Sequence, residues 1–141
     1  MCLILPPPRG FLPVLQKVKT AYLLWHEYHQ ILSKTQRYSL GQKIDNLLTE
    51  TIEAIATAAF LQKAEKLPYV RRAIQKIDTT KIFLMILWET KSLPDKKYLA
   101  LSVQLDEIGK MLGGWNGQLI KAYSTAYSAE IALATKAGKA S

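Results

Sequence analysis

The chain has 141 residues, 49% of them hydrophobic and 21% charged, which suits one globular domain and excludes a compositionally disordered protein. Nineteen lysines and arginines against eleven aspartates and glutamates give a formal net charge of +8. This surplus favours a polyanionic partner, such as nucleic acid, an anionic membrane or an acidic protein surface, whereas a single cysteine excludes an internal disulfide and a cysteine-based zinc site.

The first predicted elements are a lead segment and a helix. Residues 1–12 contain PPPRGF, which favours an extended, polyproline-type conformation. Pro13 suits a first helical turn, and apolar residues then recur every three or four positions. We therefore expect a helix over about residues 13 to 33.

The second and third helices are predicted from capping and proline signals. Ser39 precedes Gln42 by three residues, as in a capping box, and the apolar pattern after it predicts a helix to about Leu61. Pro68 disfavours helical angles in the residue before it, so the next helix is expected over about residues 68 to 91.

The segment IFLMILW in the second half of that third helix is apolar on every side, which a one-sided surface helix does not need. It is expected either at the centre of the fold or against a second subunit, and we favour the subunit contact. The residues predicted at this contact are Ile82, Phe83, Met85, Ile86 and Trp115.

The fourth helix is predicted between two punctuation signals. Ser92 and Asp95 have capping-box spacing with Pro94 in the first turn, and apolar residues then follow at steps of three and four. Gly113-Gly114 predicts a C-cap, because glycine adopts the left-handed conformation without a Cβ penalty. Trp115 is expected to seal the end of the helices or to contact a neighbour.

The pattern as a whole predicts an all-α fold. Residues 13–115 are expected to form an antiparallel up-down-up-down four-helix bundle, with helices of about 20 residues and roughly 30 Å. Residues 116–141 are rich in alanine and serine, and a short, weakly anchored C-terminal helix or a disordered tail is expected there.

Catalytic and metal-binding patterns are missing from the sequence. His26 and His29 are three residues apart, whereas the helical zinc-protease motif needs four, so we expect two half-exposed histidines without a metal. No Glu-x-x-His motif of the di-iron bundles occurs, and GKM after Ile108 lacks the rest of a phosphate loop. We expect a protein without cofactor that is not an enzyme.

Positive charge is the remaining functional signal. Over residues 63–76 only Glu65 interrupts the cations, which fits a phosphate-binding patch or, alternatively, a solvated face that keeps the protein soluble. Lys81 falls on the apolar stripe of the third helix, so its ammonium either extends to water or lines a channel made by oligomerisation. The candidate binding residues are Lys63, Lys66, Arg71, Arg72, Lys76, Lys81 and Lys110.

The expected compartment is the cytoplasm. The apolar start MCLILPPPRG lacks the basic n-region of a secretory signal, and the seven-residue run IFLMILW is far shorter than the ~20 residues that cross a bilayer. A single cysteine suits a reducing environment.

Four segments, RYSLGQKIDNLL, KLPYVRRAIQKID, LWETKSLPDKKY and especially EIGKMLGGW, resemble the accessory variability determinant (Avd) proteins of diversity-generating retroelements. The resemblance covers about residues 12 to 116. Avd proteins belong to a wider four-helix-bundle family that includes proteins encoded in intervening sequences of large ribosomal RNA genes. That branch typically shows an RRAA(V)SIPANIAEG-like second helix, where this chain has KIDNLLTETIEAIATAAF, which favours the Avd branch.

The resemblance implies a basic bundle that assembles into a barrel-shaped homopentamer and is not an enzyme. It implies binding to the retroelement's reverse transcriptase, to template RNA and possibly to DNA, in support of error-prone cDNA synthesis that diversifies a target gene. Lys81 matches a basic position of the family that would face an inner surface of the assembly. One turn later the family often has an arginine where this chain has Met85.

Two other hypotheses stay open. The chain is alternatively a structural or protein-interaction bundle whose positive face meets an acidic partner, or a bundle protein of the ribosomal RNA intervening-sequence type. Salt-sensitive nucleic-acid binding separates the accessory-protein hypothesis from the acidic partner. A reverse transcriptase gene beside the reading frame separates it from the intervening-sequence type.

Overall fold

The computed structural model describes residues 11–140, with side chains described for residues 13–138. This part of the chain is all-helical and contains no strand. The elements are α1 (Phe11–Ile31), α2 (Lys34–Arg37), α3 (Leu40–Ala59), α4 (Lys63–Glu89) and α5 (Asp95–Ala140). The lead expected over residues 1–12 lies outside the described residues, except that Phe11 and Leu12 already belong to α1.

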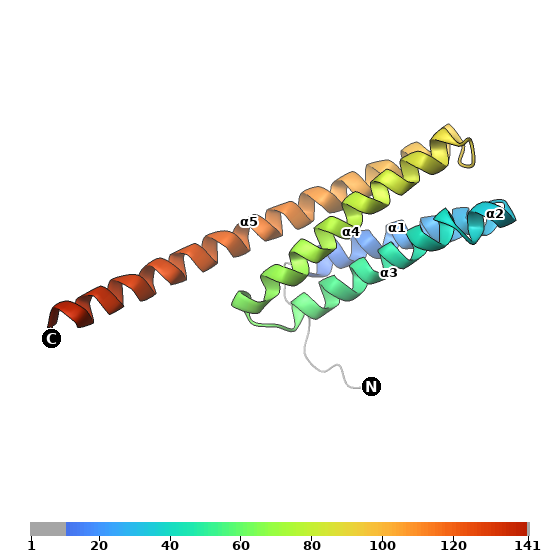
Figure 1. Ribbon diagram of the computed structural model, residues 1–141. Helices are drawn as coiled ribbons and strands as arrows, with labels where there is room; N and C mark the ends of the chain where they lie inside the picture. Colours follow the sequence, from blue (N-terminus) through green and yellow to red (C-terminus); the bar gives the residue numbers. More distant parts are fainter. Residues whose placement is uncertain (1–10, 141) are drawn as a thin grey trace, which may run out of the picture.

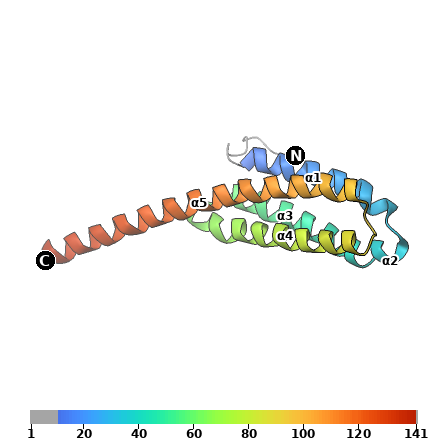
Figure 2. The ribbon, with the colours of Figure 1, turned by 90° about the horizontal axis from the view of Figure 1, so that it is seen from above.

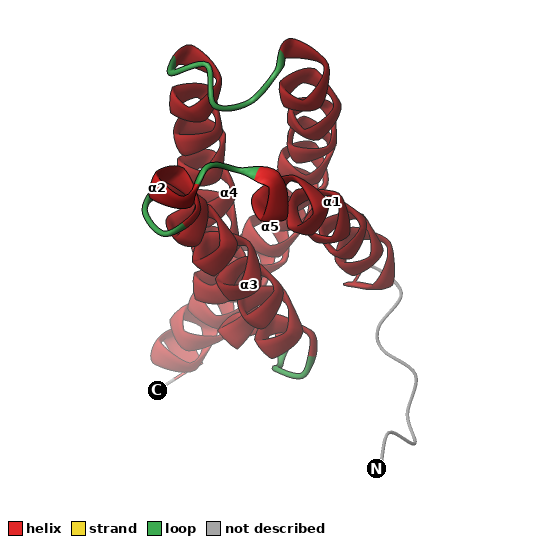
Figure 3. Ribbon diagram, turned by 90° about the vertical axis from the view of Figure 1, so that its right-hand side faces the viewer, coloured by secondary structure: helices red, strands yellow, loops and turns green. Residues whose placement is uncertain are grey.

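The four long helices pack against one another, as the sequence predicted. α1 and α4 each contact both α3 and α5, and consecutive helices are joined by short connections, drawn in green in Figure 3. Figures 1 and 2 show α1, α3, α4 and the first part of α5 side by side, with α5 continuing past the other helices to the C-terminus.

The core is built from the apolar stripes of all four long helices. Each helix turns one stripe inward because residues three and four apart share a face. The largest fully buried side chains are Trp25, Ile44, Leu48, Ile55, Ile77, Leu84, Leu87, Leu101, Leu105, Ile108, Leu112 and Val14. Burial of these side chains holds the four long helices against one another.

The segment IFLMILW divides between the core and the surface. Leu84 and Leu87 are fully buried within the chain, whereas Ile82 is 53% and Met85 39% exposed. One side of the segment is therefore part of the core, and its opposite side is left uncovered by this chain. The subunit contact expected for that side stays a prediction.

One expected helix start was wrong, and the expected caps of two other helices differ in detail. α4 begins at Lys63, so Pro68 lies inside the helix near its N-terminus instead of opening it. Ser39 makes no side-chain capping bond, because its hydroxyl donates to the carbonyl of Thr35 at 2.7 Å. Pro94 lies just before α5, where its carbonyl accepts from the N–H of Tyr98 at 2.9 Å. Local hydrogen bonds determine how these three helices begin.

The C-cap expected at Gly113-Gly114 was also wrong. Both glycines lie in the interior of α5, and no glycine in the described residues has a positive φ. The reason is packing on both sides of the pair: Leu112 is fully buried and Leu119 is only 6% exposed, so the helix is held beyond the glycines. A helix-ending glycine needs the chain to turn away, and here the core holds it in line.

The division expected at residues 115/116 falls inside α5 as well. Trp115 is half-buried against the core, and Leu119 packs with Ala58 and Val70 at the end of the body. Beyond Leu119 the side chains are almost all exposed. Within the described residues this region continues α5 as one uninterrupted helix and is not a separate short one.

A tight corner joins α1 to α3 through α2. The ring of His29 stacks on Trp25, with ring centres 5.2 Å apart, and its Nε2 lies 2.9 Å from the carbonyl oxygen of Arg37. A carbonyl only accepts, so Nε2 donates in this bond. A Cβ on Gly41 would come within 2.8 Å of both that ring and the carbonyl of Gln36. Glycine at residue 41 therefore permits the close approach.

Candidate nucleic-acid interface

The structure separates the predicted cations into those used internally and those left on the surface. Lys66 is half-buried, and its ammonium donates to the carbonyls of Ala58 and Ala59 at 2.7 and 3.2 Å. These carbonyls belong to the last turn of α3, where helix carbonyls lack intrahelical partners and the helix dipole favours a positive charge. Lys66 therefore caps the C-terminal end of α3.

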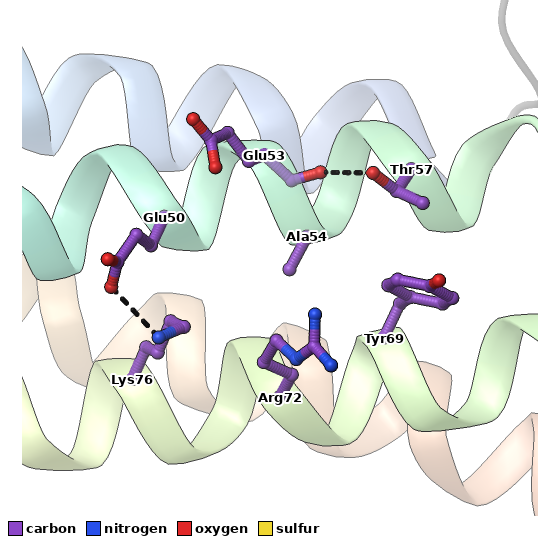
Figure 4. A pocket seen from close by; sticks show the side chains of 7 residues that line it. All are labelled: Glu50, Glu53, Ala54, Thr57, Tyr69, Arg72 and Lys76. Atoms are coloured by element: carbon purple, nitrogen blue, oxygen red, sulfur yellow. Dashed lines mark hydrogen bonds and ion pairs between the residues drawn. The ribbon is translucent and has the colours of Figure 1, made fainter.

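Two more of the predicted cations form ion pairs between helices. Lys76 Nζ on α4 lies 2.9 Å from Glu50 Oε2 on α3, the pair drawn in Figure 4. Lys81 Nζ lies 3.1 Å from Asp106 Oδ1 on α5. It also lies close to Gly109, since a Cβ added at that glycine would be 3.2 Å from Lys81 Nζ. The ammonium of Lys81 thus reaches the surface from the apolar stripe and finds a carboxylate there.

Arg71 and Arg72 are the cations that remain exposed on α4 beside each other. Arg72 lies over the ring of Tyr69, 5.3 Å from the ring centre, which favours a cation–π contact. Among residues 13–138, no carboxylate lies within ion-pairing distance of either arginine. Lys63 and Lys110 are exposed too, but neither lines the two clefts that contain an arginine.

Arg72 lines two clefts, and Arg71 lines the second of them. The first, between α3 and α4, has a volume of ≈ 340 Å³ and is shown in Figure 4. Its lining mixes charges of both signs: Glu50, Glu53, Ala54, Thr57, Tyr69, Arg72 and Lys76. Because carboxylates balance the cations, this cleft is a poor site for an anion.

The second cleft lies between the start of α4 and the outer part of α5 and has a volume of ≈ 440 Å³. Its lining contains both arginines and no carboxylate: Ala64, Leu67, Pro68, Arg71, Arg72, Gln75 and Tyr123. This cleft therefore presents unbalanced positive charge beside an aromatic ring. Guanidinium groups match phosphate geometry, so the arrangement suits a phosphate-bearing partner.

Tyr123 is the site residue that sequence reasoning missed. It was assigned to the tail after a helix end that does not exist. The signal was present, because apolar residues continue in the same spacing through Leu112, Trp115 and Leu119 to Ala122 and Ala126. An unbroken three-and-four spacing across Gly113 and Gly114 predicts one continuous helix.

The predicted subunit-contact residues are only partly accessible. Ile82 and Met85 are exposed, whereas Phe83, Ile86 and Trp115 are half-buried, and Phe83 and Trp115 pack against the core of their own chain. Trp88, next to them along α4, is occupied on one side: it stacks on Tyr98 and its Nε1 donates to Asp95 Oδ1 at 2.6 Å. The uncovered apolar side of α4 is thus narrower than the sequence pattern indicated.

Within the described residues, no group of three or more histidines, cysteines or carboxylates is placed to hold a metal ion. His26 is exposed and lies 2.8 Å from the side-chain amide of Gln30, and His29 belongs to the corner described above. The same residues contain no helix that is long and apolar enough to span a bilayer.

Replacing Lys66 by methionine should lower the free energy of unfolding by about 1–2 kcal/mol, because two helix-end carbonyls lose their donor. Burial lowers the pKa of the Lys66 ammonium below its ordinary 10.5. Between the pKa of Lys66 in the folded protein and its higher pKa in the unfolded chain, the unfolded chain binds more protons than the folded protein. The contribution of Lys66 to the free energy of unfolding therefore rises with pH in that range. Urea unfolding from pH 8 to 10.5 should show a growing gap between wild type and Lys66→Met. A constant or shrinking gap contradicts this.

Comparison with known proteins supports the fold. No protein-family model matches this chain, and no curated protein sequence matches it either. A solved structure is similar: a protein of unknown function from the S23 ribosomal protein family of Bacteroides thetaiotaomicron. It is 18% identical, with a TM-score of 0.69, over 77% of this chain and 98% of that one. At this identity the similarity shows a shared fold of packed helices.

Proposed function

We propose that this protein is a non-enzymatic accessory protein of a diversity-generating retroelement. In this role it binds the element's reverse transcriptase and template RNA and supports mutagenic cDNA synthesis. The proposal includes an antiparallel up-down-up-down four-helix bundle, an Avd-type homopentamer and a cytoplasmic location. The sequence segments that resemble Avd proteins support it, and so does the net charge of +8.

The observation that carries the nucleic-acid part of the proposal is the exposed arginine pair. Arg71 and Arg72 line a cleft without a carboxylate, while Lys66, Lys76 and Lys81 are engaged within the chain. Charges already balanced by a neighbour contribute little to binding a polyanion, whereas unbalanced ones release counterions when they meet phosphates. The binding surface proposed for the polyanion is therefore centred on Arg71 and Arg72.

For the predicted oligomer, the support is the uncovered side of α4. Ile82 and Met85 are exposed apolar side chains on a helix whose other side belongs to the core. Large exposed apolar patches mark contact sites on soluble proteins. Met85 stands where the Avd proteins often have an arginine, so an inner basic ring in this protein would rest on Lys81, which is shared with Asp106.

The test is titration of the protein into a labelled structured RNA, with the dissociation constant measured at several salt concentrations between 50 and 200 mM. Affinity should fall by about one to several orders of magnitude across that range, because each phosphate contact adds close to one to the slope of log K against log salt. Light scattering on the same samples should give a ring-sized mass. Absence of RNA binding at 50 mM salt would reject the nucleic-acid role.

An acidic protein partner is the second candidate, favoured by the same exposed arginines. It predicts no measurable RNA binding at physiological salt. The similar structure does not distinguish the two candidates, since the function of that protein is itself unknown. The titration above decides between the two.

A further inference from the structure

We infer that the cleft between α4 and the outer part of α5 binds single-stranded nucleic acid, with bases stacking on Tyr123 and Tyr127 and phosphates held by Arg71 and Arg72. The inference rests on the proposed nucleic-acid role and specifies its site and the form of nucleic acid. It also gives a role to the part of α5 that extends beyond the body in Figures 1 and 2.

The first observation is an exposed aromatic platform. Tyr123 and Tyr127 are one helical turn apart, and their rings are nearly parallel, at 7°, with centres 6.3 Å apart. Each residue is 55% exposed, so neither ring is used by the core. Exposed parallel rings on a rigid helix offer flat faces to bases, and stacking of this kind is tolerant of base sequence.

The second observation is that one ring of the platform lies in the cleft of the arginine pair. Tyr123 lines the same cleft as Arg71 and Arg72, although it comes from a different helix, and Tyr127 is one helical turn further along α5. The arginines and the first stacking ring therefore line a common space. A single strand presents phosphates and bases along its length, so it engages both at once.

The charge of the outer part of α5 points the same way. After Leu119 the sequence contains one carboxylate, Glu130, against three lysines, Lys121, Lys136 and Lys139. Positive charge therefore continues along the helix past the cleft. Such a basic track with interleaved aromatic rings is typical of surfaces that follow a nucleic-acid backbone without reading its sequence.

A duplex does not fit this arrangement. In a duplex the bases are stacked on one another, and aromatic side chains on a protein surface reach them only after a base is extruded, which costs unstacking energy. Tyr123 and Tyr127 would then add nothing to binding, and only the arginines would contribute. The tyrosines thus predict a preference for single strands over duplexes.

The competing occupant is a second copy of the chain. Ile120 and Ile131 are 39% and 49% exposed on α5 near the two tyrosines, and such a face can pack against another helix. A partner helix over the tyrosines would also cover a cleft that contains two guanidinium groups with no carboxylate in its lining. Leaving those charges buried and unpaired is costly, so we favour the nucleic acid.

The experiment measures dissociation constants for an unstructured 20-nucleotide RNA and for a duplex of equal length, at fixed salt. Tyr123→Ala/Tyr127→Ala should bind the single strand about 10- to 100-fold more weakly and the duplex with less than a twofold change. Tyr123→Phe/Tyr127→Phe keeps the rings and should bind like wild type. Tyr38→Ala, at a 67% exposed tyrosine near α2, is the matched control and should change nothing.

Salt dependence and mass complete the test. Because no charge is removed, the slope of log K against log salt should be unchanged in the Tyr123→Ala/Tyr127→Ala variant. If wild type binds RNA but this variant binds single strands equally well, the inference is overturned and the proposed function stands. If wild type binds neither RNA, both are overturned. A lower mass for the variant alone, by light scattering, overturns the inference in favour of the second copy.

Discussion

Replacement of Arg71 and Arg72 by glutamine should weaken RNA binding by about 10- to 100-fold near 0.1 M salt and lower the salt slope by about 1.5–2. The reason is that both arginines are exposed, form no ion pair among residues 13–138 and line a cleft without a carboxylate, although Arg72 also lines the mixed-charge cleft. The measurement is a salt series of dissociation constants for the wild-type and variant proteins, each confirmed to be folded by its helical circular dichroism.

The matched control is Lys76→Gln/Lys81→Gln, which removes the same number of positive charges from the same helix. Lys76 and Lys81 are paired with Glu50 and Asp106, so their loss should change the salt slope by less than half as much. Equal losses of affinity in the two double variants would show that net charge alone drives binding, and the arginine cleft would then have no special role.

Substitution of Gly41 by alanine should lower the free energy of unfolding by about 1–3 kcal/mol, although alanine is the better helix former. The added Cβ would lie 2.8 Å from the His29 ring and from the backbone carbonyl of Gln36. Neither can move easily, because the ring is held between Trp25 and the carbonyl of Arg37. Urea unfolding followed by circular dichroism measures the change.

Gly113→Ala is the control for that substitution, since an added Cβ there has no neighbour within 4 Å. In the middle of a helix it should stabilise the protein by about 0.5–1 kcal/mol. The two glycines thus predict opposite signs from the same chemical change. A stabilising Gly41→Ala would mean that the α1–α3 corner is looser than its contacts indicate.

The positions and inward faces of the helices could be predicted from the sequence because burial repeats along a helix. Leu101, Leu105, Ile108 and Leu112 were assigned to one stripe, and all four are fully buried. The ends of the helices could not be predicted in the same way, because they depend on which of several competing local hydrogen bonds forms. Pro68 and Gly113 are strong signals for a helix boundary, but α4 already begins at Lys63, and packing of Leu112 and Leu119 on both sides of Gly113 holds α5 together.

The candidate site was predicted by composition, and its working members were decided by contacts between helices. Arg71 and Arg72 came from the basic stretch as expected, but Lys66 and Lys76 in the same stretch are held by α3. No spacing rule within α4 reveals which carboxylate or carbonyl lies opposite on another helix. Tyr123 was missed for a related reason, since its place beside the arginines depends on α5 continuing past Gly113 and Gly114.

Because α5 is uninterrupted, it sets the distance between the packed body and the residues on its outer part, in addition to packing in the core. Its 46 residues span about 69 Å at 1.5 Å per residue, and roughly 30 Å of that lies beyond Leu119. Without a hinge in between, the distance and the angular phase of everything on the outer part are fixed relative to the packed body. One residue added or removed between the two would rotate the outer part by about 100°. Two partners, one bound to the packed body and one bound to the outer part of α5, would therefore be held at a fixed distance and in a fixed orientation.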